Sequence, residues 1–290
     1  MVDSQTPPTV AHALAGARAQ GLDSLDAQLL LLHALGRAEQ DRAWLLAHDT
    51  DTLPESAHNT LQALVLRRLQ GEPVAYLTGS KEFYGLRLTV DARVLVPRPD
   101  TETLVDWALE VLTTPAASAQ PPNALSRRAI DLGTGSGAIA LALKQHCPPA
   151  QIRAVDYSSD ALQVAQANAQ RLQLDVQFQQ GSWLSGITET FELIVSNPPY
   201  IAVADPHLCA LTHEPLPALA SGADGLDDLR TIVDQARTRL SPGGWLLLEH
   251  GYDQAALVRD LLTQAEFGQV QSRRDLAGIE RCSGGCWLGH

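Results

Sequence analysis

The segment Asn197-Pro198-Pro199-Tyr200 follows an apolar run from Phe191 to Ser196, and its residue types suit the binding of a flat amino group. Neither proline has a backbone N–H, so the chain must leave a sheet here in a stiff turn. The Asn197 side-chain oxygen and the Pro198 carbonyl oxygen can each accept one hydrogen of an NH2 group, and the Tyr200 ring can cover its face. An adenine amino group and a carboxamide fit equally well. Asn-Pro-Pro alone is more often a plain turn, so other residues must support this chemistry.

A glycine-rich turn, Asp131-Leu132-Gly133-Thr134-Gly135-Ser136-Gly137, lies upstream between a predicted strand and a predicted helix. Glycines let the backbone approach a ligand closely, and a helix N-terminus presents unpaired N–H groups. The turn is a weak signal alone. It lacks both the G-x-G-x-x-G spacing and the Walker lysine, so pyrophosphate binding is not favoured. The next predicted strand ends at Asp156, an acceptor suited to both hydroxyls of a ribose.

A third predicted strand is followed by Gly181-Ser182-Trp183. The Trp183 ring could flank an adenine, although a position in the core explains it equally well. The glycine turn, Asp156, Trp183 and Asn197 thus follow four successive predicted strands. Because ligands of open α/β sheets bind at the carboxyl ends of the strands, these groups are predicted to meet at one edge.

The order of elements predicts how these groups are positioned. From about residue 128 onward, strands alternate with helices, which favours an α/β fold with a doubly wound, mainly parallel sheet. Residues 9 to 70 instead have a helical pattern, and residues 83 to 90 resemble a hairpin. We therefore expect a helical domain at 1–78, a hairpin linker at 79–97 and a catalytic domain at 98–290. Asp100 or Thr101 is predicted to cap a helix, and Thr113 to Asn123 to form a mobile surface loop.

Composition limits the classes of function. The 290 residues are 45% hydrophobic and 19% charged, which is typical of globular proteins. A net charge of -12 disfavours a large nucleic-acid footprint. With no leader or membrane-span pattern, a cytoplasmic protein is expected. The four cysteines lack zinc-like spacing, so free thiols and no metal are predicted.

The ordered set of strand ends resembles the class I methyltransferases that use S-adenosylmethionine. A narrower resemblance extends from about Leu69 to the C-terminus, to the release factor glutamine N5-methyltransferases of the HemK/PrmC family. Its motifs are Glu72 to Gly79, Glu82 to Gly85, Leu95 to Glu102, Asp131 to Gly137, Ser196 to Ile201, His213 to Pro215 and Leu247 to Gly251. The resemblance implies a Rossmann-like catalytic sheet preceded by a small all-α substrate-recognition domain and a β-hairpin linker. It also implies methylation of the glutamine in the Gly-Gly-Gln loop of class 1 peptide chain release factors.

Site roles follow from the same resemblance. Cofactor-binding residues are expected to be Gly133, Thr134, Gly135, Ser136, Gly137, Asp156, Trp183 and Asn197. The substrate glutamine is expected at Asn197, Pro198, Pro199 and Tyr200, of which Asn197, Pro198 and Tyr200 are the expected catalytic residues. S-adenosylmethionine is the expected cofactor and S-adenosylhomocysteine its product, with a monomeric enzyme and no direct nucleic-acid substrate. Residues before Gln70 match only in helical character, and Arg281 to Trp287 depart from the family's usual closing strand.

Three other functions are compatible with parts of the pattern. A related family methylates a glutamine of a ribosomal protein and shares the tetrapeptide, although the segment Pro97 to Glu102 favours the release factor group. Adenine-N6 methyltransferases use the same amide clamp after base flipping, but the acidic charge and the lack of a basic recognition domain disfavour them. A cofactor-binding scaffold without activity is the third. Glu214 and Glu249 could form an acid/base pair or anchor loops, and Arg98 could contact the substrate.

Overall fold

The computed structural model describes residues 7–114 and 127–289. Most of the predicted loop from Thr113 to Asn123 therefore lies outside the described residues. The chain divides into two compact units, Met1–Ser80 and Lys81–His290. No helix in the described ranges is long and apolar enough to cross a membrane.

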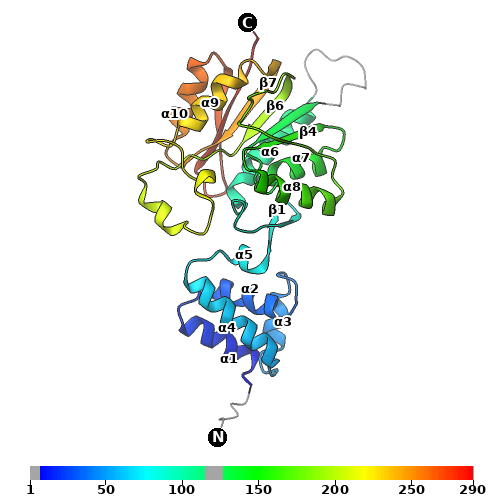
Figure 1. Cartoon of the computed structure of the whole chain (residues 1–290), viewed down its shortest axis with the longest axis vertical. Helices are drawn as coiled ribbons and strands as arrows, with labels where there is room; N and C mark the ends of the chain where they lie inside the picture. Colours follow the sequence, from blue (N-terminus) through cyan, green and yellow to red (C-terminus); the bar gives the residue numbers. More distant parts are fainter. Residues whose placement is uncertain (1–6, 115–126, 290) are drawn as a thin grey trace. The chain divides into compact units, whose positions relative to one another are not determined.

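The first unit is built from helices, as its sequence pattern predicts (Figure 1). They are α1 (Val10–Ala19), α2 (Ser24–Ala34), α3 (Arg42–Ala47), α4 (Glu55–Leu69) and α5 (Val74–Thr78). The Thr9 and Asp23 side chains accept backbone N–H hydrogens and so begin α1 and α2. Leu30, Leu31 and Leu61 are fully buried in the core of this unit. The sequence pattern did not reveal α5, because a single helical turn is stabilised by packing and not by propensity.

A short hairpin connects β1 (Ser80–Phe83) and β2 (Leu86–Thr89). Its two turn residues, Tyr84 and Gly85, both have positive φ, as the turn of a two-residue hairpin requires. The Tyr84 N–H donates to the Glu102 carboxylate at 3.0 Å. Asn168 accepts from the Thr89 N–H at 2.8 Å and donates back to the Thr89 carbonyl at 3.0 Å. The hairpin is thus fastened to helices of the second unit.

The second unit contains a seven-stranded sheet among its described residues, in the order β5-β4-β3-β6-β7-β9-β8 (Figure 1). The strands are β3 (Arg128–Leu132), β4 (Gln151–Asp156), β5 (Gln177–Gln180), β6 (Phe191–Ser196), β7 (Leu240–Glu249), β8 (Gly268–Arg274) and β9 (Glu280–Cys286). Those from β5 to β7 in this order are parallel, and β9 runs antiparallel to both neighbours. Strand order reverses between β3 and β6, the place where α/β sheets bind ligands. The predicted doubly wound, mainly parallel sheet is confirmed.

Helices α6 (Glu102–Thr113), α7 (Ala138–His146), α8 (Ser159–Leu172), α9 (Asp227–Ala236) and α10 (Ala255–Gln264) pack against this sheet. Trp107 of α6 is almost fully buried and meets the Trp245 ring edge-on, with 5.9 Å between ring centroids. Thr101 precedes α6 at the predicted N-cap position, as the last residue of a 3-10 turn, η1 (Pro99–Thr101), but the predicted capping by its side chain is wrong, because that side chain makes no capping bond. The Thr101 hydroxyl instead accepts a hydrogen bond from Asn197.

Candidate active site

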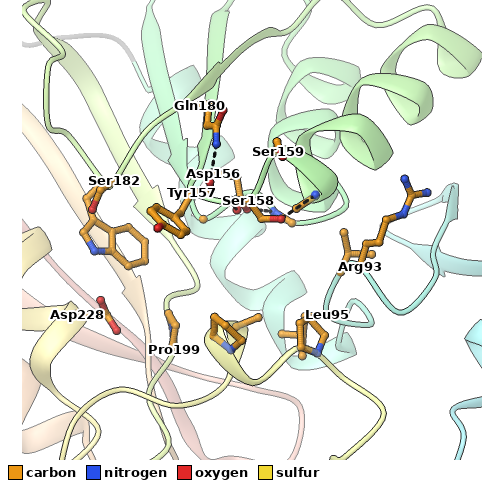
Figure 2. Close-up of a pocket in the computed structure, with 18 of the residues that line it drawn as sticks. Arg93, Leu95, Asp156, Tyr157, Ser158, Ser159, Gln180, Ser182, Pro199 and Asp228 are labelled. Carbon is orange, nitrogen blue, oxygen red and sulfur yellow. Dashed lines mark hydrogen bonds between the residues drawn. The ribbon is translucent and has the colours of Figure 1, made fainter.

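A cavity of about 670 Å³ lies at the carboxyl edge of the sheet. Four strand ends contribute to it: Gly133 and Gly135 after β3, Asp156 to Ser158 at β4, Gln180 to Trp183 at β5, and Asn197 with Pro199 after β6. Figure 2 shows Asp156, Tyr157 and Ser158 near the middle of this lining, with Pro199 and Asp228 across from them. The predicted meeting of these strand ends is present in the structure.

The three glycines of the turn after β3 have different surroundings. All have positive φ, which residues with a side chain rarely adopt. A Cβ on Gly135 would meet no atom within 4 Å, whereas one on Gly137 would lie 3.0 Å from Leu141 and 3.3 Å from Ala165. Gly135 therefore opens the backbone toward the cavity, and Gly137 allows α7 and α8 to pack closely. Gly137 is not among the residues that line the cavity.

Asp156 holds the glycine turn in place while facing the cavity. Its Oδ2 accepts from the Gly135 N–H at 2.8 Å, and its Oδ1 accepts from the Ser158 N–H at 2.9 Å. Burial raises the pKa of this carboxyl group, and the N–H donors partly offset that rise. A carboxylate has about four lone-pair sites, so these N–H donors leave it able to accept from a ligand hydroxyl.

Thr134 and Ser136 are buried and do not line the cavity. The Thr134 hydroxyl donates to Asp131 Oδ2 at 2.6 Å, and the Ser136 carbonyl accepts from the Asn168 side chain at 3.0 Å. Asp131 Oδ1 has no hydrogen-bond partner among the described residues, and burial raises the pKa of this carboxyl group to about 7. These residues support the turn from beneath.

Trp183 lines the cavity and also packs against the hydrophobic core. A Cβ on Gly133 would lie 3.2 Å from the Trp183 ring, so the missing side chain makes room for it. The Trp183 backbone has φ of 51°, a strained value for a bulky residue that is enriched at functional sites. Both expected roles, core and cavity wall, are compatible with this position.

The tetrapeptide after β6 divides between the cavity and its supports. Asn197 and Pro199 line the cavity, whereas Pro198 and Tyr200 do not. The Asn197 Nδ2 group donates to the Thr101 hydroxyl at 3.2 Å. The Tyr200 hydroxyl lies 3.4 Å from Glu249 Oε1, and the Tyr200 carbonyl accepts from Gln254 Nε2 at 3.0 Å. Contacts with Thr101, Glu249 and Gln254 therefore hold the turn in place.

Glu214 anchors the loop that approaches this turn. Its carboxylate is almost fully buried, accepts from the Val96 N–H at 3.0 Å and forms an ion pair with Arg98. Glu249, the other acid considered, belongs instead to the surroundings of Tyr200. Arg98 and Glu214 thus act on the loop, and no pairing between Glu214 and Glu249 is present among the described contacts.

Several cavity residues were not predicted from the sequence. They come from the segment after β2 (Arg93, Val94 and Leu95), from the chain after β6 (Pro215, Pro217 and Ala218) and from the start of α9 (Asp228). None lies at the end of a strand of the sheet or in the turn directly after it, so the strand-end rule could not find them. The motifs Leu95 to Glu102 and His213 to Pro215 contain two of them, Leu95 and Pro215, and were the available signal.

Comparisons with known proteins agree with this architecture. Residues 10–79 match the PrmC N-terminal domain and residues 105–214 the Methyltransferase small domain. The chain is 49% identical to the release factor glutamine methyltransferase of Bordetella pertussis, over 91% of this chain and 95% of that protein. It is 47% identical to the Xylella fastidiosa (strain Temecula1) protein of the same name, over 94% and 96%.

A solved methyltransferase from Pyrococcus furiosus has a similar fold, with a TM-score of 0.53 and 18% identity, over 79% of this chain and 98% of that one. At this identity the likeness concerns the fold alone. The sequence relatives are much closer and extend over nearly their whole length. The chain therefore belongs to the release factor glutamine methyltransferase family.

Proposed function

We propose that this protein transfers a methyl group from S-adenosylmethionine to the side-chain amide nitrogen, N5, of the glutamine in the Gly-Gly-Gln motif of class 1 release factors. The observation that carries the proposal is the orientation of Asn197. Its Nδ2 group donates to the Thr101 hydroxyl while the residue lines the cavity, and we infer that its Oδ1 atom is the acceptor presented there. An acceptor there, beside the carbonyl of Pro198, suits a carboxamide NH2.

The cavity fits the cofactor in three respects. Its volume lies within the ~300–1,000 Å³ typical of small-molecule sites. Gly135 leaves open space in front of the backbone, and Asp156 offers acceptors for ribose hydroxyls. We propose that Gly133, Gly135, Asp156, Trp183 and Asn197 contact the cofactor. Thr134, Ser136 and Gly137 support the turn. When bound, S-adenosylmethionine supplies an electrophilic methyl group on sulfur.

Asn197, Pro198 and Tyr200 would then prepare the nitrogen. A carboxamide nitrogen is a poor nucleophile because its lone pair is delocalised into the carbonyl group. Acceptance of both amide hydrogens by the Asn197 Oδ1 and Pro198 carbonyl oxygens orients the nitrogen and increases its electron density. The Tyr200 and Pro199 rings would cover the amide and exclude water. The nitrogen loses its proton late, so no strong general base is required.

The helical first unit would help to bind the release factor, since the catalytic residues belong to the second unit. We also propose a monomeric, cytoplasmic enzyme with a domain at 1–78, a linker at 79–97 and a catalytic domain at 98–290. No nucleic-acid substrate is proposed, because the chain has a net charge of -12.

The deciding experiment incubates the protein with methyl-labelled S-adenosylmethionine and a purified release factor, followed by peptide mapping with mass spectrometry. Label is expected on the glutamine of the Gly-Gly-Gln motif. A release factor with asparagine at that position is the matched control and should take no label. Parallel reactions contain ribosomal proteins or adenine-containing nucleic acid. Label confined to either of these would overturn the proposal.

A further inference from the structure

Three side chains meet behind the proposed amide clamp. Strands β6 and β7 are parallel neighbours in which Ser196 pairs with Leu248, so Asn197 and Glu249 stand side by side at the edge of the sheet. Thr101 reaches both from η1: it accepts from Asn197 Nδ2 at 3.2 Å, and it interacts with the Glu249 carboxyl group and lowers its pKa. Thr101 is 4% exposed and Glu249 is 1% exposed.

The number of hydrogens available decides the direction of each bond. An ionised carboxylate can only accept, and a hydroxyl group has one hydrogen to donate. Oε2 of Glu249 is buried and accepts no hydrogen bond from the described residues, so its lone pairs are open to the hydrogen of the Thr101 hydroxyl, which interacts with this carboxyl group. The Thr101 oxygen must then accept from its other neighbour. Asn197 can satisfy this only by presenting its NH2 group to Thr101.

We propose that Glu249 and Thr101 are positioning residues that fix the direction of this hydrogen-bond chain and so present the Asn197 oxygen to the substrate amide. The inference rests on the proposed function. If the chain reversed, Asn197 would direct its NH2 group at the NH2 group of the substrate. Two donors facing each other cannot form a hydrogen bond, and the amide would lose one of its two acceptors.

The surroundings of Glu249 disfavour its ionised form on balance, but the group still ionises above neutral pH. Burial raises the pKa of the group to about 7, while Thr101, Arg281 and Tyr200 lower it and Asp100 raises it. The Cys282 thiol also faces the group. The carboxylate is therefore the acceptor in mildly alkaline solution, at about pH 8.

A cap for α6 is the alternative role of Thr101, and it conflicts with the geometry. The Thr101 side chain makes no capping bond, so its removal should leave the hydrogen bonds at the start of α6 unchanged. Glu249 likewise ends a strand whose backbone pairs with β6 and β9 without its side chain. Both side chains thus have polar contacts directed at the tetrapeptide.

Single-turnover and steady-state methylation of the release factor at about pH 8 tests the proposal. Thr101→Val preserves shape but removes the hydroxyl, and it should lower kcat ~10-fold or more, as loss of an orienting partner does. KM and Kd for S-adenosylmethionine should be unchanged. Thr101→Ser restores the hydroxyl and should restore kcat. Thr113→Val is the matched control: it removes an exposed hydroxyl from the last residue of α6 and should leave kcat unchanged.

Double variants separate positioning from general damage. Glu249→Gln should lower kcat because its NH2 group can donate to Thr101 and reverse the chain. In a Thr101→Val background, the same change should cost little further kcat, since the connection is already absent. Thr101→Val should likewise cost nothing further in an Asn197→Ala background. Tyr200→Phe reports any contribution through the other oxygen of Glu249.

Several outcomes would overturn the inference. They are wild-type kcat in Thr101→Val, failure of Thr101→Ser to restore kcat, and losses that multiply in the double variants. If Thr101→Val does not fold, as measured by its thermal unfolding and cofactor binding, the comparison of Glu249→Gln with Asn197→Ala decides alone. Failure of the proposed function is distinguishable, because wild-type protein would then not methylate the release factor.

Discussion

At the scale of single residues, the Asn197 amide and the Asp156 carboxylate are expected to have different roles. Asn197 stands at the cavity with its NH2 group engaged by Thr101, and Asp156 faces the cavity while holding the glycine turn. We propose that the first acts on a substrate amide and the second on a cofactor hydroxyl. Their substitution should therefore affect different kinetic constants.

Asn197→Ala should lower the single-turnover rate ~100-fold or more, because it removes an acceptor aligned with the reacting nitrogen. It should change cofactor affinity much less. Asp156→Ala should instead weaken S-adenosylmethionine binding, measured by isothermal titration calorimetry. Wild-type turnover in Asn197→Ala would contradict the mechanism, and unchanged affinity in Asp156→Ala would contradict the proposed ribose contact.

Asp131 predicts a pH dependence of stability. Burial raises its pKa from 3.8 to about 7, so the folded protein holds this proton more tightly than the unfolded chain does. The unfolding free energy contributed by Asp131 therefore falls as pH rises between these values and levels off above about 7, by at most ~1.4 kcal/mol per pH unit.

Asp131→Asn removes the titration but preserves the shape of the side chain. The unfolding free energy of wild type minus that of the variant, from urea denaturation without cofactor, should fall between about pH 5 and about pH 8. A constant difference over that range would show that Asp131 is already ionised at the lower pH.

At the scale of elements, the position of α6 depends on small residues in β9. A Cβ on Gly284 would lie 2.5 Å from the Leu247 side chain, 2.7 Å from the Leu246 carbonyl oxygen and 3.0 Å from the Trp107 ring. The absence of a side chain at Gly284 thus allows α6 to pack closely against the sheet. Thr101 immediately precedes α6 and accepts the hydrogen bond from Asn197. The packing of α6 on Gly284 therefore also helps to position Thr101.

Gly284→Ala should destabilise the second unit by ~1–3 kcal/mol, because overpacking must displace backbone or ring atoms. Gly16→Ala is the matched control: it lies in α1, its Cβ meets nothing within 4 Å, and it should not affect the second unit. Denaturant unfolding of both variants, followed at the second unit, checks this. An unchanged denaturation midpoint for Gly284→Ala would mean that α6 does not pack this closely against Gly284.

At the scale of the whole molecule, each unit has a hydrophobic core of its own, and all the cavity residues belong to the second. Binding of the cofactor and recognition of the release factor are therefore expected to be separable. A chain of residues 81–290 should bind S-adenosylmethionine as the full protein does. It should methylate a release factor less efficiently than the full chain, through a higher KM. Equal KM values would contradict a recognition role for the first unit.

The sequence predicted the parts of the site that follow a local rule. Asp156 ends β4, while Gly135 and Asn197 lie in the turns that follow β3 and β6, and strand ends of a parallel sheet meet at one edge. Thr101 was predicted as a cap, because propensity describes its own helix and not a partner 96 positions away. Arg93 and Pro215 were missed for the same reason, since only the folded chain brings their segments to the cavity.

The antiparallel strand β9 has a consequence for thiol chemistry. It pairs Cys282 with Glu249, and burial raises the pKa of this thiol to about 12, whereas Cys209 is exposed. A thiol reagent should modify Cys209 at once in the native protein. In Cys209→Ser, mass spectrometry should detect modification of Cys282 only as fast as β9 separates from β7. The rate of that reaction then measures, without any substrate, how often β9 separates from β7, the strand that ends at Glu249.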